Sequence, residues 1–128
     1  MSVSFIRDVV VELDALKSRR YRTTRGVPLT FSRISRFEVK GVMKASNWVG
    51  AVKAKLRATA RGEKLLEEEY DIASTLIPVS GERRIDKSYT VNFTLPEEVR
   101  GTVELELEAT ATIGYIKLTL EEAALITQ

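Results

Sequence analysis

The stretch "TVELELEATATIGYIKLTLE", residues 102–121, decides the fold class. Over positions 103–113 every second residue is apolar, and the residues between them are Glu or Thr. A period of two is the pattern of a β-strand with one buried face. After Gly114 the alternation changes phase, because the apolar residues now fall on even positions over 116–120. This change predicts a bulge or bend in one long strand, or a tight junction between two strands.

The same alternation recurs upstream. "SYTVNFTLP", residues 88–96, repeats it and should end at Pro96, since proline cannot donate to a strand ladder. "KAKLRATARG", residues 53–62, also alternates and reaches a hairpin-like turn at Gly62. The following residues, 64–74, should return as the partner strand. A helix from Trp48 to Tyr70 is the competing interpretation, but five successive alternations and the glycine favour strands.

The remaining segments are shorter. Residues 26–35 and 35–47 each indicate a strand, the second with Gly41 as a bulge. Residues 4–16, "SFIRDVVVELDAL", fit either a helix or a strand, and the run of three valines favours a strand. "IPVSGERRID", residues 77–86, contains proline and glycine and is expected to be a loop or turn. The tail, "LEEAALITQ", is expected to form a short helical turn or to fray.

These segments give about seven short strands in a chain of 128 residues. That count and length predict a single domain spanning residues 1–128, an antiparallel β-sandwich of immunoglobulin-like or related architecture.

The composition excludes several kinds of chemistry. The chain has no cysteine and no histidine, which removes disulfides, thiolate zinc sites, the Ser-His-Asp triad and the commonest general base. The acidic cluster of residues 67–71 is not expected to hold calcium, because alternation on a strand sends Glu68 to the face opposite Glu67 and Glu69. We therefore expect no catalytic residues, no metal, no cofactor and no enzymatic activity.

Charge and hydropathy give further expectations. Residues 1–64 carry 15 basic and 5 acidic residues, a net of +10, whereas residues 65–128 carry 5 and 13, a net of −8. Such halves either present a basic binding surface or neutralise each other in the fold. A high content of Lys, Arg and Glu together with the absence of Cys is typical of proteins from thermophiles. No apolar run reaches the roughly 18 residues of a membrane span, and no secretory signal is evident, so we expect a cytoplasmic protein.

Two basic regions are the candidate contacts for an anion or a nucleic acid. The first, which we call the basic stripe, lies on one strand face and comprises Lys53, Lys55, Arg57 and Arg61. Its spacing of about 6.6–7 Å between alternate residues resembles the spacing of phosphates along one nucleic-acid strand. Glu104, Glu106 and Glu108 have the same spacing with the opposite sign. If the two strands are neighbours, we expect cross-strand ion pairs in place of phosphate contacts.

The second region, the basic segment, is "KSRRYRTTR", residues 17–25. Its candidate contact residues are Lys17, Arg19, Arg20, Arg22 and Arg25. In a loop or arm these residues would have no obligatory cross-strand partner and could contact phosphate. The alternative is a solvated connection whose arginines bond locally. Trp48, the only tryptophan, is expected to pack in the core or at an edge rather than to stack on a ligand.

The stretch 37–120 resembles the LEA14-like family, also called the water-stress and hypersensitive-response domain. The resemblance lies in the order of "FEVKGVMKASNW", "VKAKLRATARGEKLLEEEY", "IPVSGERRIDKSYTVNFTLP" and "VELELEATATIGYIKLTL". It implies a single β-sandwich, a stress-associated binding or stabilising role, and no enzymatic activity; it assigns no functional residues. The resemblance identifies no particular partner and is compatible with protein clients.

Two other functions remain open on the residues alone. The two basic regions suit a nucleic-acid-binding protein, and exposed edge strands suit a structural subunit that pairs with copies of itself. The opposite charges of the two halves are compatible with head-to-tail association.

Overall fold

The computed structural model describes residues 2–14, 20–29, 33–94 and 101–127, and all of its regular elements are β-strands. Their bounds are β1 (Ser2–Asp14), β2 (Arg20–Leu29), β3 (Arg33–Ala60), β4 (Glu63–Thr94) and β5 (Gly101–Thr127). Every pairing between them is antiparallel. The expectation of an all-β antiparallel chain is therefore confirmed.

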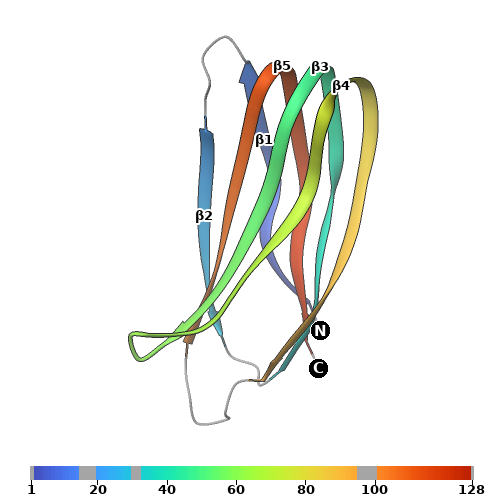
Figure 1. The fold of residues 1–128 in the computed structure, drawn as a ribbon. Coiled ribbons are helices and arrows are strands. Elements are labelled where there is room, and N and C mark those ends of the chain that lie inside the picture. The colour runs from blue at the N-terminus through green and yellow to red at the C-terminus, as the bar shows by residue number, and fades with distance from the viewer. Residues whose placement is uncertain (1, 15–19, 30–32, 95–100, 128) are drawn as a thin grey trace.

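The strands form one sheet that folds back on itself. The order is β1-β5-β3-β4, and β2 pairs with β5 as well. Figure 1 shows β3, β4 and β5 arching over, so that the two halves of each strand face one another. The registers explain the arch, because the first half of β5 pairs with β2 and its second half pairs with β1.

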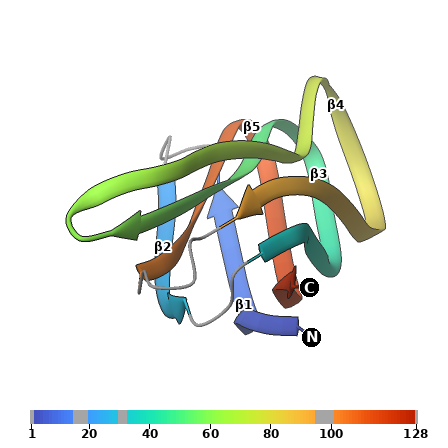
Figure 2. The same cartoon turned by 90° about the horizontal axis from the view of Figure 1, so that it is seen from below.

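The fold thus has two arms. The first arm contains β1 with the second half of β5, the first half of β3 and the second half of β4. The second arm contains β2 with the first half of β5, the second half of β3 and the first half of β4. Figure 2, seen from below, shows the two sets of strands apart, with the hairpin between β3 and β4 projecting to one side.

The bend lies at Asn47 of β3 and Gly114 of β5. Both have positive φ, 51° and 73°, and the register between the two strands shifts between Ser46 and Val49. A Cβ on Gly114 would collide with the carbonyl oxygens of Asn47 and Ser46, so only glycine lets the two backbones approach this closely. The phase change seen in the sequence is therefore a bend in one long strand rather than a junction between two.

The turn at Gly62 is confirmed as a two-residue hairpin loop. Ala60 lies opposite Glu63, and Arg61 and Gly62 between them both have positive φ, 53° and 78°. Positive φ at both central residues defines the type I′ turn, whose twist matches that of the flanking strands. The strands either side of this loop also rule out the alternative helix from Trp48 to Tyr70.

Three expectations about the elements need correction. The described part of the chain has five strands, three of them 27–32 residues long, and not about seven short ones, because each bend is absorbed within a strand. Residues 77–86 belong to β4 and are not a loop; the register with β3 shifts on both sides of Val79, at residues 76–78 and at Ser80. The tail is strand up to Thr127 because it pairs with both β1 and β3, so a helical turn was wrong.

Other expectations are confirmed. Residues 2–14 are a strand, which settles the ambiguity of the N-terminal segment; Ala15 and Leu16 lie outside the described residues. The register between β3 and β5 shifts at Gly41, as expected of a bulge. Pro96, the expected end of the strand "SYTVNFTLP", is not among the described residues.

The core lies between the two arms and follows the alternation. Odd residues of β5 from Val103 to Ala111 are buried, and after the bend the even residues Ile116, Leu118 and Leu120 are buried. Ile113, expected to continue the inward face, is exposed because it lies next to the bend. Trp48 is only 1% exposed, and its indole N–H donates to the Thr110 carbonyl oxygen at 3.2 Å. The expectation that this tryptophan packs in the core is confirmed.

Candidate binding surfaces

The basic stripe runs along the middle of the second arm, between two acidic strands. The register pairs its residues with β5 as Lys53 with Glu108, Lys55 with Glu106, and Arg57 with Glu104. On the other side, the same three residues lie opposite β4 at Asp71, Glu69 and Glu67. The expected arrangement of a basic strand beside an acidic one is therefore present, and it occurs on both sides.

Ion pairs join these strands. Lys53 Nζ lies 3.3 Å from Glu69 Oε1, and Lys55 Nζ lies 3.4 Å from Glu67 Oε1. The guanidinium of Arg57 reaches both neighbours, with Nε 3.8 Å from Glu67 Oε2 and Nη1 3.7 Å from Glu104 Oε2. Three of the four residues of the stripe, Lys53, Lys55 and Arg57, therefore form ion pairs within the sheet, which makes this part of it a poor isolated contact for a phosphate backbone.

Glu67 is where most of these ion pairs converge. Its carboxylate contacts Lys64 of the hairpin as well as Lys55 and Arg57 of β3. The hydrogen bond from Lys64 lowers the pKa of Glu67, with smaller contributions from Lys55, and partial removal from water opposes this shift. Glu67 therefore stays ionised to lower pH than an ordinary glutamate.

The two basic regions do not form one surface. β5 lies between β2 and β3, so its three glutamates separate the basic segment from the basic stripe. Arg20, Arg22 and Arg25 belong to β2, in register with Thr110, Glu108 and Leu105. Arg61 is exposed in the hairpin turn, and Lys17 and Arg19 lie outside the described residues. Across the second arm, the strands therefore alternate in charge as basic β2, acidic β5, basic β3 and acidic β4.

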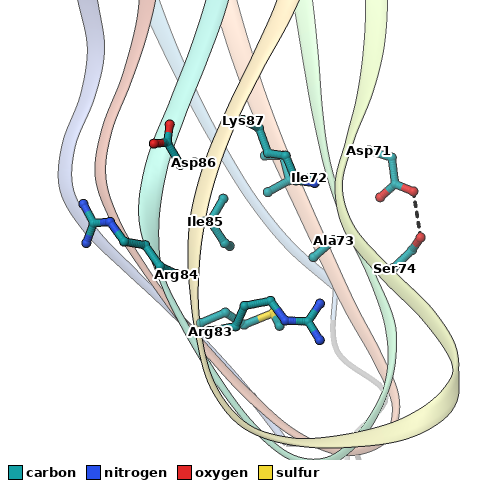
Figure 3. Close-up of a pocket in the computed structure, with 10 residues that line it drawn as sticks. Asp71, Ile72, Ala73, Ser74, Arg83, Arg84, Ile85, Asp86 and Lys87 are labelled. Atoms are coloured by element: carbon teal, nitrogen blue, oxygen red, sulfur yellow. Dashed lines mark hydrogen bonds between the residues drawn. The ribbon is translucent and has the colours of Figure 1, made fainter.

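A groove of about 520 Å³ lies where the two arms meet along β4 (Figure 3). Ile72 and Ile85, both buried, line it from opposite arms. Arg83 and Lys87 point toward the side formed by residues 71–74, whereas Arg84 and Asp86 point the other way. The groove thus has apolar walls and a charged rim.

One of two hydrogen bonds beside this groove joins the two arms. The Ser74 hydroxyl donates to Asp71 Oδ2 at 2.7 Å, and the Tyr89 hydroxyl donates to the Asp71 carbonyl oxygen at 2.7 Å. The second bond crosses from one arm to the other. The rings of Phe37, Tyr70 and Tyr89 pack beside it, with centroids 4.7–6.0 Å apart. Beside the groove, the two arms are therefore joined by one hydrogen bond and by packed aromatic rings.

The phenols of this cluster are perturbed by their surroundings. Burial raises the pKa of both Tyr70 and Tyr89 because it disfavours the charged phenolate. The neighbouring carboxylate of Glu68 raises the pKa of Tyr70 further, and that of Asp71 does the same for Tyr89. Both phenols therefore remain neutral hydrogen-bond donors well into the alkaline range.

Sequence reasoning missed this groove, and it also missed a projecting apolar tip. Leu76 and Ile77 are 96% and 71% exposed on the irregular segment of β4. The alternation gives no signal for either feature, because both depend on how β4 bends. The sequence predicted a strand for residues 64–74 and a loop or turn for residues 77–86. Only the arch of β4 brings residues 71–74 and 83–87 together.

The described residues contain no group of three or more Cys, His, Asp or Glu side chains suited to holding a metal ion. No helix long and apolar enough to cross a membrane occurs in the part of the chain that the structure covers.

Comparison with known proteins identifies a fold and no family. No family model matches the chain, and no curated protein matches it. Among solved structures, a protein of infectious bursal disease virus strain Gt aligns with a TM-score of 0.54 and 10% identity over 99% of this chain. The enzymatically active domain of tailspike protein 4 of bacteriophage CBA120 aligns with a TM-score of 0.53 and 12% identity over 98%.

This chain spans only 32% of the viral protein and 19% of the tailspike domain. At such identities the likeness concerns the fold alone. This chain is therefore similar to these proteins in its arrangement of strands.

Proposed function

We propose that this chain is a non-enzymatic binding or stabilising protein that contacts other protein chains along the edge of its sheet. The observation that carries the proposal is the position of β4. This strand runs for 32 residues and, among the described elements, pairs with β3 alone. An edge strand presents backbone donors and acceptors on its outer side, and a second chain can pair with them.

The charged side chains support a surface role. On the second arm they occupy strand faces in cross-strand pairs. The groove on β4 has apolar walls and a charged rim, which suits a segment of another protein. The resemblance of residues 37–120 to LEA14-like proteins supports the same kind of role.

The same proposal includes a finer description of the fold. The two facing arms, with the core between them, support an antiparallel β-sandwich. In this description each arm is one layer, and the strands that bend belong to both layers. The immunoglobulin-like or LEA14-like connectivity stays a prediction.

The experiment is a client-protection assay. A heat-labile enzyme is heated alone, with this protein, and with an equal mass of serum albumin, and its residual activity and light scattering are followed. The proposal predicts that this protein preserves more activity than albumin does. Equal inactivation in all three samples would contradict the stabilising role.

A second candidate function, nucleic-acid binding, rests on the place of the basic segment. β2 pairs with β5 alone among the described strands, so Arg20, Arg22 and Arg25 belong to an edge of the sheet. Fluorescence anisotropy of labelled single- and double-stranded oligonucleotides tests it at low and physiological salt. Binding that survives physiological salt and is lost when Arg19, Arg20 and Arg22 become alanine would support this function. Its absence even at low salt would exclude it.

A further inference from the structure

We infer that the protein associates with itself head to tail, with the first half of β4 of one copy pairing with β2 of the next. This inference rests on the proposed function, because it names the protein chain that the edge of the sheet binds. The partner is a second copy of this chain.

The two edges of the second arm carry opposite charge. The first half of β4 contributes the carboxylates Glu67, Glu68, Glu69 and Asp71. The strand at the other edge, β2, contains three arginines and no acidic residue. Like charges directly opposite one another are destabilising in a sheet, and unlike charges are stabilising. An edge of this protein therefore repels the same edge of another copy and attracts the other edge.

The directions of the strands fit this pairing. β2, β5, β3 and β4 are successively antiparallel across the second arm, so β2 and β4 run in opposite directions. When a second copy is placed beside the first in the same orientation, its β2 is antiparallel to the first copy's β4. The antiparallel sheet then continues without interruption, and so does the alternation of basic and acidic strands.

The register between β2 of one copy and β4 of the next is limited by the faces of the sheet, which must continue across the contact. Position 22 is in register with Glu108, Glu108 with Lys53, and Lys53 with Asp71. Directly opposite residues of an antiparallel pair share a face. Even positions of β2 must therefore lie opposite odd positions of β4, since the side chains of a continuous sheet keep their face.

Two registers that satisfy this rule place both Arg20 and Arg22 opposite carboxylates. One of them also places Arg25 opposite Lys64, a contact between like charges. We infer the other, which places position 20 opposite 71, position 22 opposite 69 and position 24 opposite 67. Two of these contacts join an arginine to a carboxylate, and the third joins Thr24 to Glu67. Because the contact uses two different surfaces, it is heterologous and yields a ring or an open chain of copies and not a two-fold dimer.

Cysteine cross-linking tests the pairing directly, because the natural chain contains no cysteine. Positions 23 and 68 lie opposite one another in the inferred register, so Thr23→Cys and Glu68→Cys are prepared as separate single variants. An equimolar mixture should form a disulfide-linked dimer under mild oxidation, and neither variant should do so alone. Ser88→Cys, exposed on the second half of β4, is the matched control and should not cross-link to Thr23→Cys. Circular dichroism confirms that each variant is folded.

A charge-reversal pair gives a second, independent readout. Arg20→Glu and Asp71→Lys should each lower the concentration-dependent increase in sedimentation coefficient, and an equimolar mixture of the two should restore it. Cross-linking of Glu68→Cys with itself, or equal cross-linking of the Ser88→Cys control, would overturn the inference. So would a monomer at every concentration in low salt.

The two proposals fail in different ways. A monomeric protein that still protects a heat-labile client would contradict head-to-tail association and leave the proposed function intact. A protein that assembles as inferred but protects no client would be a structural subunit and would contradict the stabilising role. A protein that binds an oligonucleotide and stays monomeric without it would assign β2 to nucleic acid and would overturn the inference.

Discussion

Arg57 and Glu104 lie directly opposite each other on β3 and β5, with Arg57 Nη1 3.7 Å from Glu104 Oε2. They are 47 positions apart in the sequence and belong to halves of opposite net charge. Because β3 lies between β4 and β5, the same guanidinium also contacts Glu67. The pairing of strands thus places basic residues from the first half of the chain beside acidic residues from the second half.

Reversal of this charge should destabilise the fold. Arg57→Glu removes its cross-strand ion pairs and places a carboxylate between two acidic strands. Since each cross-strand pair contributes about 0.2–1 kcal/mol, we expect the free energy of unfolding to fall by about 1–2 kcal/mol. Urea unfolding followed by circular dichroism measures it.

The control for this change is Arg33→Glu, at an exposed position of β3 that lies opposite Thr94. It should leave the midpoint nearly unchanged. The exchange variant Arg57→Glu/Glu104→Arg should recover part of the lost stability. Equal effects of Arg33→Glu and Arg57→Glu would show that the ion pairs do not stabilise the sheet.

The bend should depend on Gly114 more strongly than the hairpin depends on Gly62. Both have positive φ, but a Cβ on Gly114 would collide with Asn47 and Ser46, whereas a Cβ on Gly62 meets open space. Gly62→Ala should cost about 1–2 kcal/mol for the left-handed conformation. Gly114→Ala should cost clearly more, and chemical denaturation compares the two. Equal losses would mean that the close approach at the bend does not constrain the fold.

Trp48 should report on the core. Its emission should be blue-shifted and poorly quenched by iodide, because the side chain is buried. Trp48→Phe removes the donor to the Thr110 carbonyl oxygen and should lower the free energy of unfolding by about 1–3 kcal/mol. Tyr115→Phe, which removes an exposed hydrogen bond to Glu12, is the control and should change stability much less. Solvent-exposed emission in the native protein would contradict the burial of this side chain.

Stability should fall in alkaline solution. The folded state raises the pKa of Tyr70 and Tyr89, so above the ordinary phenol pKa of about 10 the folded chain holds protons that the unfolded chain has lost. This contribution is fully present below that pH and is lost as the pH rises through the folded-state pKa values. Urea unfolding at increasing pH should show the decline. The double variant Tyr70→Phe/Tyr89→Phe should have a flatter profile, and a profile as steep as that of the unchanged protein would assign the decline to other groups.

The projecting tip should contribute nothing to stability. Leu76→Ser/Ile77→Ser changes two exposed side chains and should alter the free energy of unfolding by no more than about 0.5 kcal/mol. The comparison is Ile72→Ser on the same strand, where the side chain is buried and the loss should exceed about 2 kcal/mol. Thermal denaturation distinguishes them. A large loss in the tip variant would show that these side chains pack in the native protein.

The alternation in the sequence predicted the strands, the faces and the cross-strand charges because these depend on local period. It placed Leu105 and Leu107 on the buried face and Glu106 on the opposite face, and it located a change at Gly114 without deciding between a bend in one strand and a junction between two. The matching spacing predicted ion pairs between β3 and β5 if the two strands are neighbours; the register shows that they are, and Arg57 pairs with Glu104. The strands, their faces and the spacing of their charges follow from residues that are close in sequence and share the two-residue period.

The rest could not be predicted, because it depends on which strands are neighbours. The expected turn at residues 77–86 is strand, since β3 pairs with Val79 and with residues 81–86 despite Pro78 and Gly81. The groove requires residues 71–74 and 83–87 to face each other across the bend of β4. The position of β5 between the two basic regions likewise follows from topology, and local patterning contains no information about it.

Sedimentation velocity on the unmodified protein, over a wide range of concentration and at two ionic strengths, tests whether the acidic edge of one copy binds the basic edge of the next. At about 0.01 M salt the Debye length is about 30 Å and at about 1 M about 3 Å, so attraction between the acidic and basic edges is strong in the first and screened in the second. If the two edges pair as inferred, the sedimentation coefficient rises with concentration at low salt and the rise is largely lost at high salt. A single monomeric species under both conditions would contradict head-to-tail association.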